Sequence, residues 1–146
     1  MTDISKSKSA FQFTKPILKE VIFVEAGGES GESNNFLQTN VSEIENKDNE
    51  RSAHVSLTLS NFEELESNEI TSSPYLLRVT MEAKFKWNSE LINEELESNL
   101  LRINAPSLLL SYIRPVVSEL TVASAYQEEI VPFIDFTQNN RYKEDR

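Results

Sequence analysis

Hydrophobic and polar residues alternate most regularly between Tyr75 and Trp87. The odd positions of this segment are apolar or aromatic, and most of its even positions are polar. Successive side chains of a β-strand point to opposite faces, so a period of two is typical of a strand with one buried face. The segment therefore predicts a long, half-buried strand.

Three earlier segments alternate less regularly and predict further strands. They are residues 11–25, 36–45 and 53–65. The expected connections are a glycine-rich loop at 26–35, a charged turn at 46–52 and a break at 67–74. Proline has no backbone N–H to donate, so we expect the first strand to bend at Pro16 or to lie at the edge of the sheet.

The spacing of apolar residues changes from strand-like to helical after Ser89. Ile92, Leu96, Leu100 and Ile103 recur at the spacing of one helix face. Residues 104–107 are expected to interrupt this helix, and Pro106 suits the first turn of a second helix that runs to about Ala125. Pro115 should kink that second helix.

The order of strands followed by helices predicts an α+β fold. We expect a four-stranded antiparallel sheet followed by a long, kinked helix. All of it belongs to a single domain at residues 11–136, with a flexible N-terminus at 1–10 and a polar tail at 137–146.

Charge and composition exclude several classes of function. The chain has 14 basic and 24 acidic residues, a net charge of −10, which disfavours nucleic acids and anionic membranes as partners. It has no cysteine, so disulfides and thiolate chemistry are excluded. No apolar run approaches the ~18 residues of a membrane span, and the N-terminus has no signal-peptide core, so we expect a cytoplasmic protein.

The candidates for catalysis are weak. His54, the only histidine, lies near the start of a predicted strand and opposite to Val55, which favours a surface position over a catalytic base. The glycine-rich residues 27–33 contain two acids and no lysine, unlike a phosphate-binding loop. The acidic pairs are expected on solvated faces. A small enzyme remains the third hypothesis, and we predict binding or assembly with no cofactor and no metal.

Three motifs, taken in order, resemble the SecB family of export chaperones. They are residues 11–23, with Phe11, Lys19 and Phe23 at matching spacing; residues 104–114; and Pro132 through Phe136. The similarity spans about residues 11–136. It implies a four-stranded sheet with a long helix, assembly into dimers or dimers of dimers, and ATP-independent capture of unfolded polypeptides.

The resemblance implies a holdase chaperone that serves protein export or a toxin–antitoxin system, with an antitoxin as the client in the second case. The alternative is an interaction or structural protein on the same fold without client binding. From the general layout of the family we expect five residues to line a client-binding groove: Phe36, Phe85, Trp87, Leu109 and Tyr112. Core packing is the competing interpretation for each of them.

The family also docks the motor protein SecA on acids of the outer sheet face, beside a leucine. Here Glu20 keeps one acid and Leu76 keeps the leucine, whereas Val24 and Arg78 stand where two further acids would be. The docking tail of SecA is basic, and like charges at an interface are unfavourable. We therefore predict weak or absent SecA binding.

Overall fold

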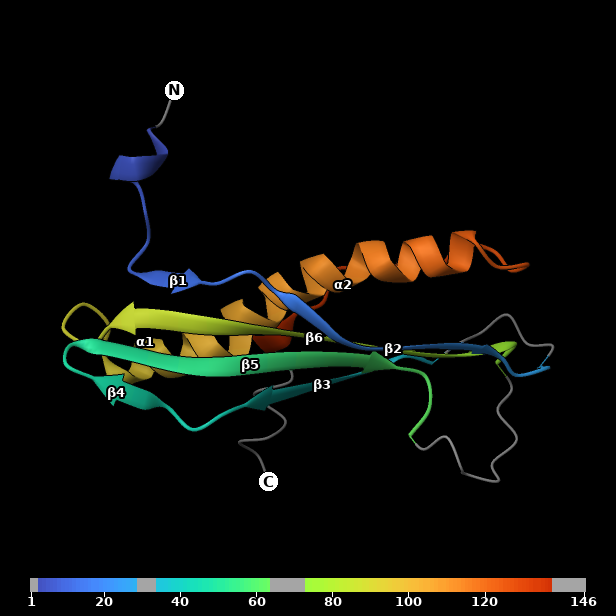
Figure 1. The fold of residues 1–146 in the computed structure, drawn as a ribbon, viewed down its shortest axis with the longest axis horizontal. Coiled ribbons are helices and arrows are strands. Elements are labelled where there is room, and N and C mark those ends of the chain that lie inside the picture. The colour runs from blue at the N-terminus through green and yellow to red at the C-terminus, as the bar shows by residue number, and fades with distance from the viewer. Residues whose placement is uncertain (1–2, 29–33, 64–72, 138–146) are drawn as a thin grey trace.

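A computed structural model describes residues 3–28, 34–63 and 73–137, and shows one antiparallel sheet with helices against one of its faces (Figure 1). The strands are β1 (Phe11–Phe13), β2 (Ile17–Glu25), β3 (Phe36–Val41), β4 (Glu45–Lys47), β5 (Glu50–Ser60) and β6 (Tyr75–Asn88). The helical elements are η1 (Ile4–Lys6), α1 (Glu94–Asn99), the π-helical η2 (Leu100–Asn104) and α2 (Ala105–Val122). The α+β prediction is confirmed.

The two longest strands, β5 and β6, pair with each other at the centre of the sheet. β1 and β2 both pair with the free side of β6, and β3 and β4 both pair with the free side of β5. The described residues thus form six strands that occupy four positions across the sheet, because β1 and β2 share one edge and β3 and β4 share the other. The predicted count of four strands is wrong.

Two of the expected strands are each divided into two. The first is interrupted before Ile17, where Pro16 cannot donate a ladder hydrogen bond. The second is interrupted at residues 42–44, where the hydroxyl of Ser42 accepts the backbone N–H of His54 at 2.8 Å in place of a ladder bond. The predicted bend at the proline and its edge position are both present.

The predicted charged turn at 46–52 is also wrong, because most of it is strand. Lys47 pairs with Glu50, so only Asp48 and Asn49 form the turn between β4 and β5. Asp48 has a φ of 58°, in the left-handed region that aspartate adopts more readily than most residues. The predicted loop, break and tail extend into residues 29–33, 64–72 and 138–146, which lie outside the described residues.

The helical segment is continuous, so the predicted interruption at residues 104–107 is wrong. Asn93 caps α1 by accepting the N–H of Leu96 at 2.8 Å, and η2 leads directly into α2, with Asn104 itself in helical conformation. Pro115 lies inside α2 without ending it. None of the helices in the described part of the chain is long and apolar enough to cross a membrane.

The core lies between the central strands and α2. It is formed by the face of the sheet that we call the inner face, which carries the odd positions of β5 and β6. Its most deeply buried large side chains are Leu57, Leu59, Leu77, Phe85, Leu109 and Ile113. The opposite, outer face carries the even positions of β5 and β6, and α1 and α2 both lie on the other side of the sheet, as Figure 1 shows.

Residues 123–136 turn back after α2 and pack against it. The guanidinium of Arg114 donates to the carbonyl oxygen of Val131 at 2.9 Å and lies 4.7 Å from the ring centre of Phe133. Val131 and Phe136 are buried by this return. The C-terminal segment therefore contributes to the core, even though it has no strand or long helix.

Candidate functional site

The five residues predicted to bind a client do not lie on one exposed surface. Phe85, Trp87 and Leu109 are buried in the core. Phe36 is 66% exposed at the start of β3 and lies on the outer face, where its register partner is Ser60. Tyr112 is 41% exposed on α2, which packs against the other face. Within one chain, these side chains therefore form no common groove.

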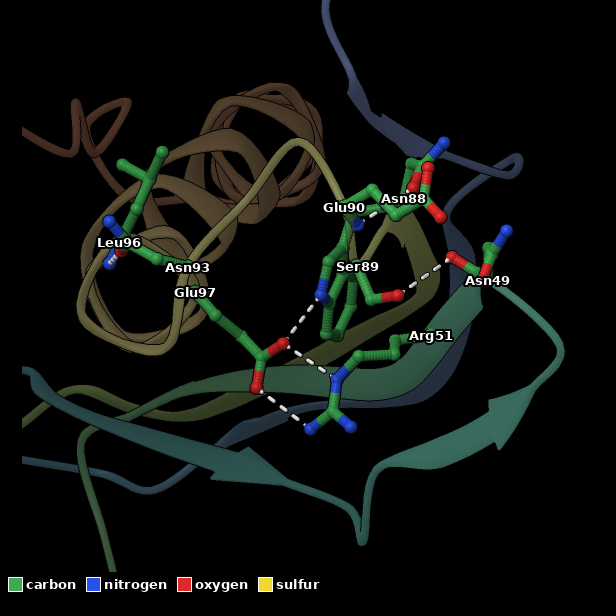
Figure 2. A network of polar contacts seen from close by, with 9 residues as sticks. Asn49, Arg51, Asn88, Ser89, Glu90, Asn93, Leu96 and Glu97 are labelled. Carbon is green, nitrogen blue, oxygen red and sulfur yellow. Dashed lines mark hydrogen bonds and ion pairs between the residues drawn. The ribbon is translucent and has the colours of Figure 1, made fainter.

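Trp87 belongs instead to a buried polar cluster that fastens α1 to the central strands. Its indole N–H donates to Glu97 at 2.6 Å. Arg51 of β5 donates to both carboxylate oxygens of Glu97, at 2.8 and 3.0 Å, and Figure 2 shows this two-pronged contact. We call these three residues the Glu97 cluster. It explains the buried position of an acid in α1, because both carboxylate oxygens of Glu97 accept hydrogen bonds.

The electrostatics of the Glu97 cluster favour a charged pair. Burial raises the pKa of Glu97, but the hydrogen bonds from Arg51 and Trp87 and the charge of Arg51 together hold that pKa below its ordinary value. The bond to Glu97 raises the pKa of Arg51. Both groups stay ionised at neutral pH, so the cluster is a structural tie with no free acid or base.

A row of four exposed apolar side chains lies along β2, and others lie on β3, on α2 and in the loops. Leu18 and Val21 project from its inner face, and Ile17 and Val24 project from its outer face, with exposed fractions between 39% and 54%. In the described part of the chain β2 pairs with β6 alone, so its other side presents backbone N–H and C=O groups without a neighbouring strand. We call this side of the sheet the β2 edge.

The charged residues of β2 do little to protect this edge. Lys19 lies 3.4 Å from Glu82, and Glu20 lies 2.6 Å from Arg78, so two of the three charges of β2 are paired with a charge on β6. The third, Glu25, is its last residue. Natural edge strands are usually blocked by unpaired charges, prolines or a covering element. The bulge between Leu18 and Glu20, the preceding Pro16 and the terminal Glu25 serve that purpose here. An extended polypeptide could therefore be added to the sheet along β2.

The four residues matched to the SecA-docking face lie on the outer face together. Val24 is the register partner of Leu76, and Glu20 forms the ion pair with Arg78. The one acid kept from the family pattern is therefore neutralised by the residue that replaces another acid. Sequence reasoning placed these residues on one face by their even numbering, but it did not foresee that two of them would pair.

The fold is SecB-like, as comparison with solved structures shows. No protein family and no curated protein matches the sequence significantly. The structure is similar to the SecB-like chaperone Rv1957 of Mycobacterium tuberculosis, solved in complex with a ChAD peptide from the Rv1956 HigA1 antitoxin. The TM-score is 0.53 at 14% identity, over 90% of this chain and 95% of that one. The structure is also similar to that of a Streptococcus agalactiae protein of unknown function. The TM-score is 0.54 at 11% identity, over 84% of this chain and 97% of that one.

Proposed function

We propose that this chain is an ATP-independent holdase chaperone that binds extended, aggregation-prone polypeptides along the β2 edge. The observation that carries the proposal is a nine-residue edge strand with exposed apolar side chains on both of its faces. The SecB-like fold supports a chaperone over an enzyme. The antitoxin peptide bound by Rv1957 supports the toxin–antitoxin setting over general export.

An extended client matches the geometry of this edge. Its backbone would bond to the free N–H and C=O groups of β2, which suits any sequence. Its alternate side chains would contact Leu18 and Val21 on the inner face, and Ile17 and Val24 on the outer face. Affinity then depends on apolar content and extended conformation, which are the properties shared by unfolded chains.

The same edge is suited to a second copy of the chain, which would compete with a client for it, and we infer a dimer as the smallest assembly. A stable interface typically buries about 1,200–2,000 Å². Two β2 strands in antiparallel contact could add apolar contacts on both faces of a continuous sheet. Light scattering that gives a 16.7 kDa monomer at micromolar concentration would contradict this assembly.

SecA is expected to bind weakly or not at all. Val24 supplies no charge, and the carboxylate of Glu20 is already paired with Arg78, so a basic tail meets little negative potential there. Titration calorimetry with a SecA tail peptide should show tighter binding for Val24→Glu/Arg78→Glu than for the natural sequence. Tight binding by the natural sequence, unimproved by these changes, would show that the charge argument is wrong.

The test of the proposal places lysines on one edge and then on the other. In Leu18→Lys/Val24→Lys, two side chains that are about half exposed become cations on the β2 edge. We expect loss of ATP-independent aggregation suppression and a fall of about tenfold or more in affinity for an extended apolar peptide. The matched control, Phe36→Lys/Val41→Lys, makes the same charge change on β3 and should bind within about twofold of the natural chain.

The outcomes of this test separate the hypotheses. If the β3 variant loses binding and the β2 variant keeps it, the client lies at Phe36 and the β2 edge is not the site. If the natural chain suppresses no aggregation, the alternative of an interaction protein without clients is favoured. Circular dichroism of both variants establishes that they fold, so that a loss of binding is not a loss of structure.

A further inference from the structure

A depression of about 770 Å³ lies at the end of the sheet where β1 pairs with β6 and β4 pairs with β5. It is bounded by residues 8–10, which we call the N-terminal arm, and by the β4–β5 hairpin. Four lysines line it: Lys8 on the arm, Lys47 on β4, and Lys84 and Lys86 on β6. Three ion pairs are formed among the described residues, and none of them involves these lysines. We call this region the lysine depression.

The strand register shows how its charges are arranged on the outer face. Lys86 lies between Gln12 of β1 and Ser52 of β5, and Lys84 lies beside His54. The acids that line the depression are Glu45, Asp48 and Glu50, all on the β4–β5 hairpin. Lys47 is the register partner of Glu50. The β6 side of the depression is therefore cationic, and its rim at the hairpin carries the negative charge.

This local charge is opposite to that of the molecule. The chain has a net charge of −10, yet four of its 14 basic residues line one depression. Long-range attraction of phosphate backbones is weak for such a chain, and the acidic rim adds repulsion. A single acidic segment is a better match, because its carboxylates can reach the lysines while its uncharged residues pass the rim.

We propose that the lysine depression binds an acidic segment of a partner polypeptide in extended form. Lys84 and Lys86 are two residues apart on one face of β6, which places them roughly 6.6 Å apart along the strand. Carboxylates at alternate positions of an extended peptide have the same spacing. The site is on the outer face and is separate from apolar binding at the β2 edge, so it does not depend on the proposed chaperone function.

The test uses a fluorescently labelled peptide in which glutamate and serine alternate, with anisotropy as the readout. We expect saturable binding that weakens with salt, and a loss of about tenfold or more in Lys84→Glu/Lys86→Glu, where attraction becomes repulsion. Lys15→Glu/Arg102→Glu makes the same change in net charge at two exposed positions outside the depression. This control should bind within about twofold of the natural chain.

Further outcomes decide between ligand classes. A peptide of the same composition in which pairs of glutamates alternate with pairs of serines has no two glutamates two residues apart, and it should bind more weakly. Equal weakening in both charge variants would overturn the proposal, since it would show a general field effect. No binding of the alternating peptide, or equally tight binding of inorganic phosphate or single-stranded DNA, would overturn it too. Both variants should keep client binding at the β2 edge.

Discussion

The two edges of the sheet differ in how they avoid unwanted pairing. The β3–β4 edge is divided into strands of six and three residues. It carries the polar Gln38, Asn40, Glu45 and Lys47 beside the exposed apolar Phe36, Val41 and Ile44. The β2 edge has nine consecutive residues with apolar side chains on both faces. Two of the three charges of β2, Lys19 and Glu20, are paired with charges on β6.

Cover from the C-terminal segment adds to this difference. Glu129 accepts the hydroxyl of Tyr75 at 2.6 Å and the side-chain amide of Asn35, which directly precedes β3. Its backbone N–H donates to the buried Thr121 at 2.9 Å. Tyr75 in turn adjoins β2, as the register partner of Glu25 and with its ring centre 5.0 Å from that of Phe23. One edge is thus divided by a break and tied to the C-terminal segment through Asn35, while the other keeps a longer strand available for pairing.

The largest expected loss of stability comes from disrupting the Glu97 cluster, which joins α1 to the central strands that both edges pair with. Glu97→Gln leaves Arg51 without its counter-charge and weakens the hold of α1 on β5 and β6. Loss of one partner of a buried pair costs several kcal/mol, and because Arg51 is partly exposed we expect about 2–3 kcal/mol. Urea denaturation measures it, and Glu95→Gln at an exposed position of α1 should cost under about 0.5 kcal/mol.

Lowering the pH should weaken the Glu97 cluster in the natural chain, because it protonates Glu97. The pKa of Glu97 in the folded protein lies below its ordinary value of 4.5, so its stabilising contribution is fully present above that pH. The contribution is lost as the pH falls through the lower, folded pKa. The difference in unfolding free energy between the natural chain and Glu97→Gln should therefore narrow below pH 4.5 and stay constant above it. A gap that widens on acidification would show that the sign is wrong.

A smaller loss of stability is expected from removing the carboxylate of Glu129, which accepts hydrogen bonds from Tyr75 and from Asn35 before β3. Burial raises the pKa of Tyr75, and its bond to Glu129 raises it further, so the hydroxyl stays protonated and needs an acceptor. Glu129→Ala removes that acceptor, at a cost of about 1–2 kcal/mol. Hydrogen exchange should speed up at the start of β3, beside Asn35, and at the end of β2, where Glu25 pairs with Tyr75. Exposed Glu119→Ala is the control and should change neither edge.

The smallest effect is expected at Lys19, whose ion pair with Glu82 is exposed to solvent. Lys19→Thr should change stability by less than about 0.5 kcal/mol, because surface pairs contribute little. It removes a cation from the β2 edge, so client affinity should rise by about twofold. Lys15→Thr, which lies before β2, should leave affinity unchanged. A fall in affinity with Lys19→Thr would mean that clients contact this charge.

The core of the fold could be predicted from local pattern because that pattern repeats over many residues. The alternation from Tyr75 to Trp87 is the buried face of β6, and Pro16 marks both a break and an edge. Helical spacing after Ser89 located the helical segment, although its continuity through Asn104 was missed. The sequence shows an interruption there, while the backbone passes it with a single π-helical turn.

The sequence by itself determined the α+β class, the central strand, the helical segment and the absence of thiol chemistry, since each follows from composition or from periodicity within one segment. Only the tertiary structure decided which apolar residues stay exposed, because burial depends on what covers each strand. Phe85, Trp87 and Leu109 are covered, whereas Leu18, Val21 and Val24 are half exposed. The Glu97 cluster was equally hidden, since Arg51, Trp87 and Glu97 meet only when α1 folds back on the sheet.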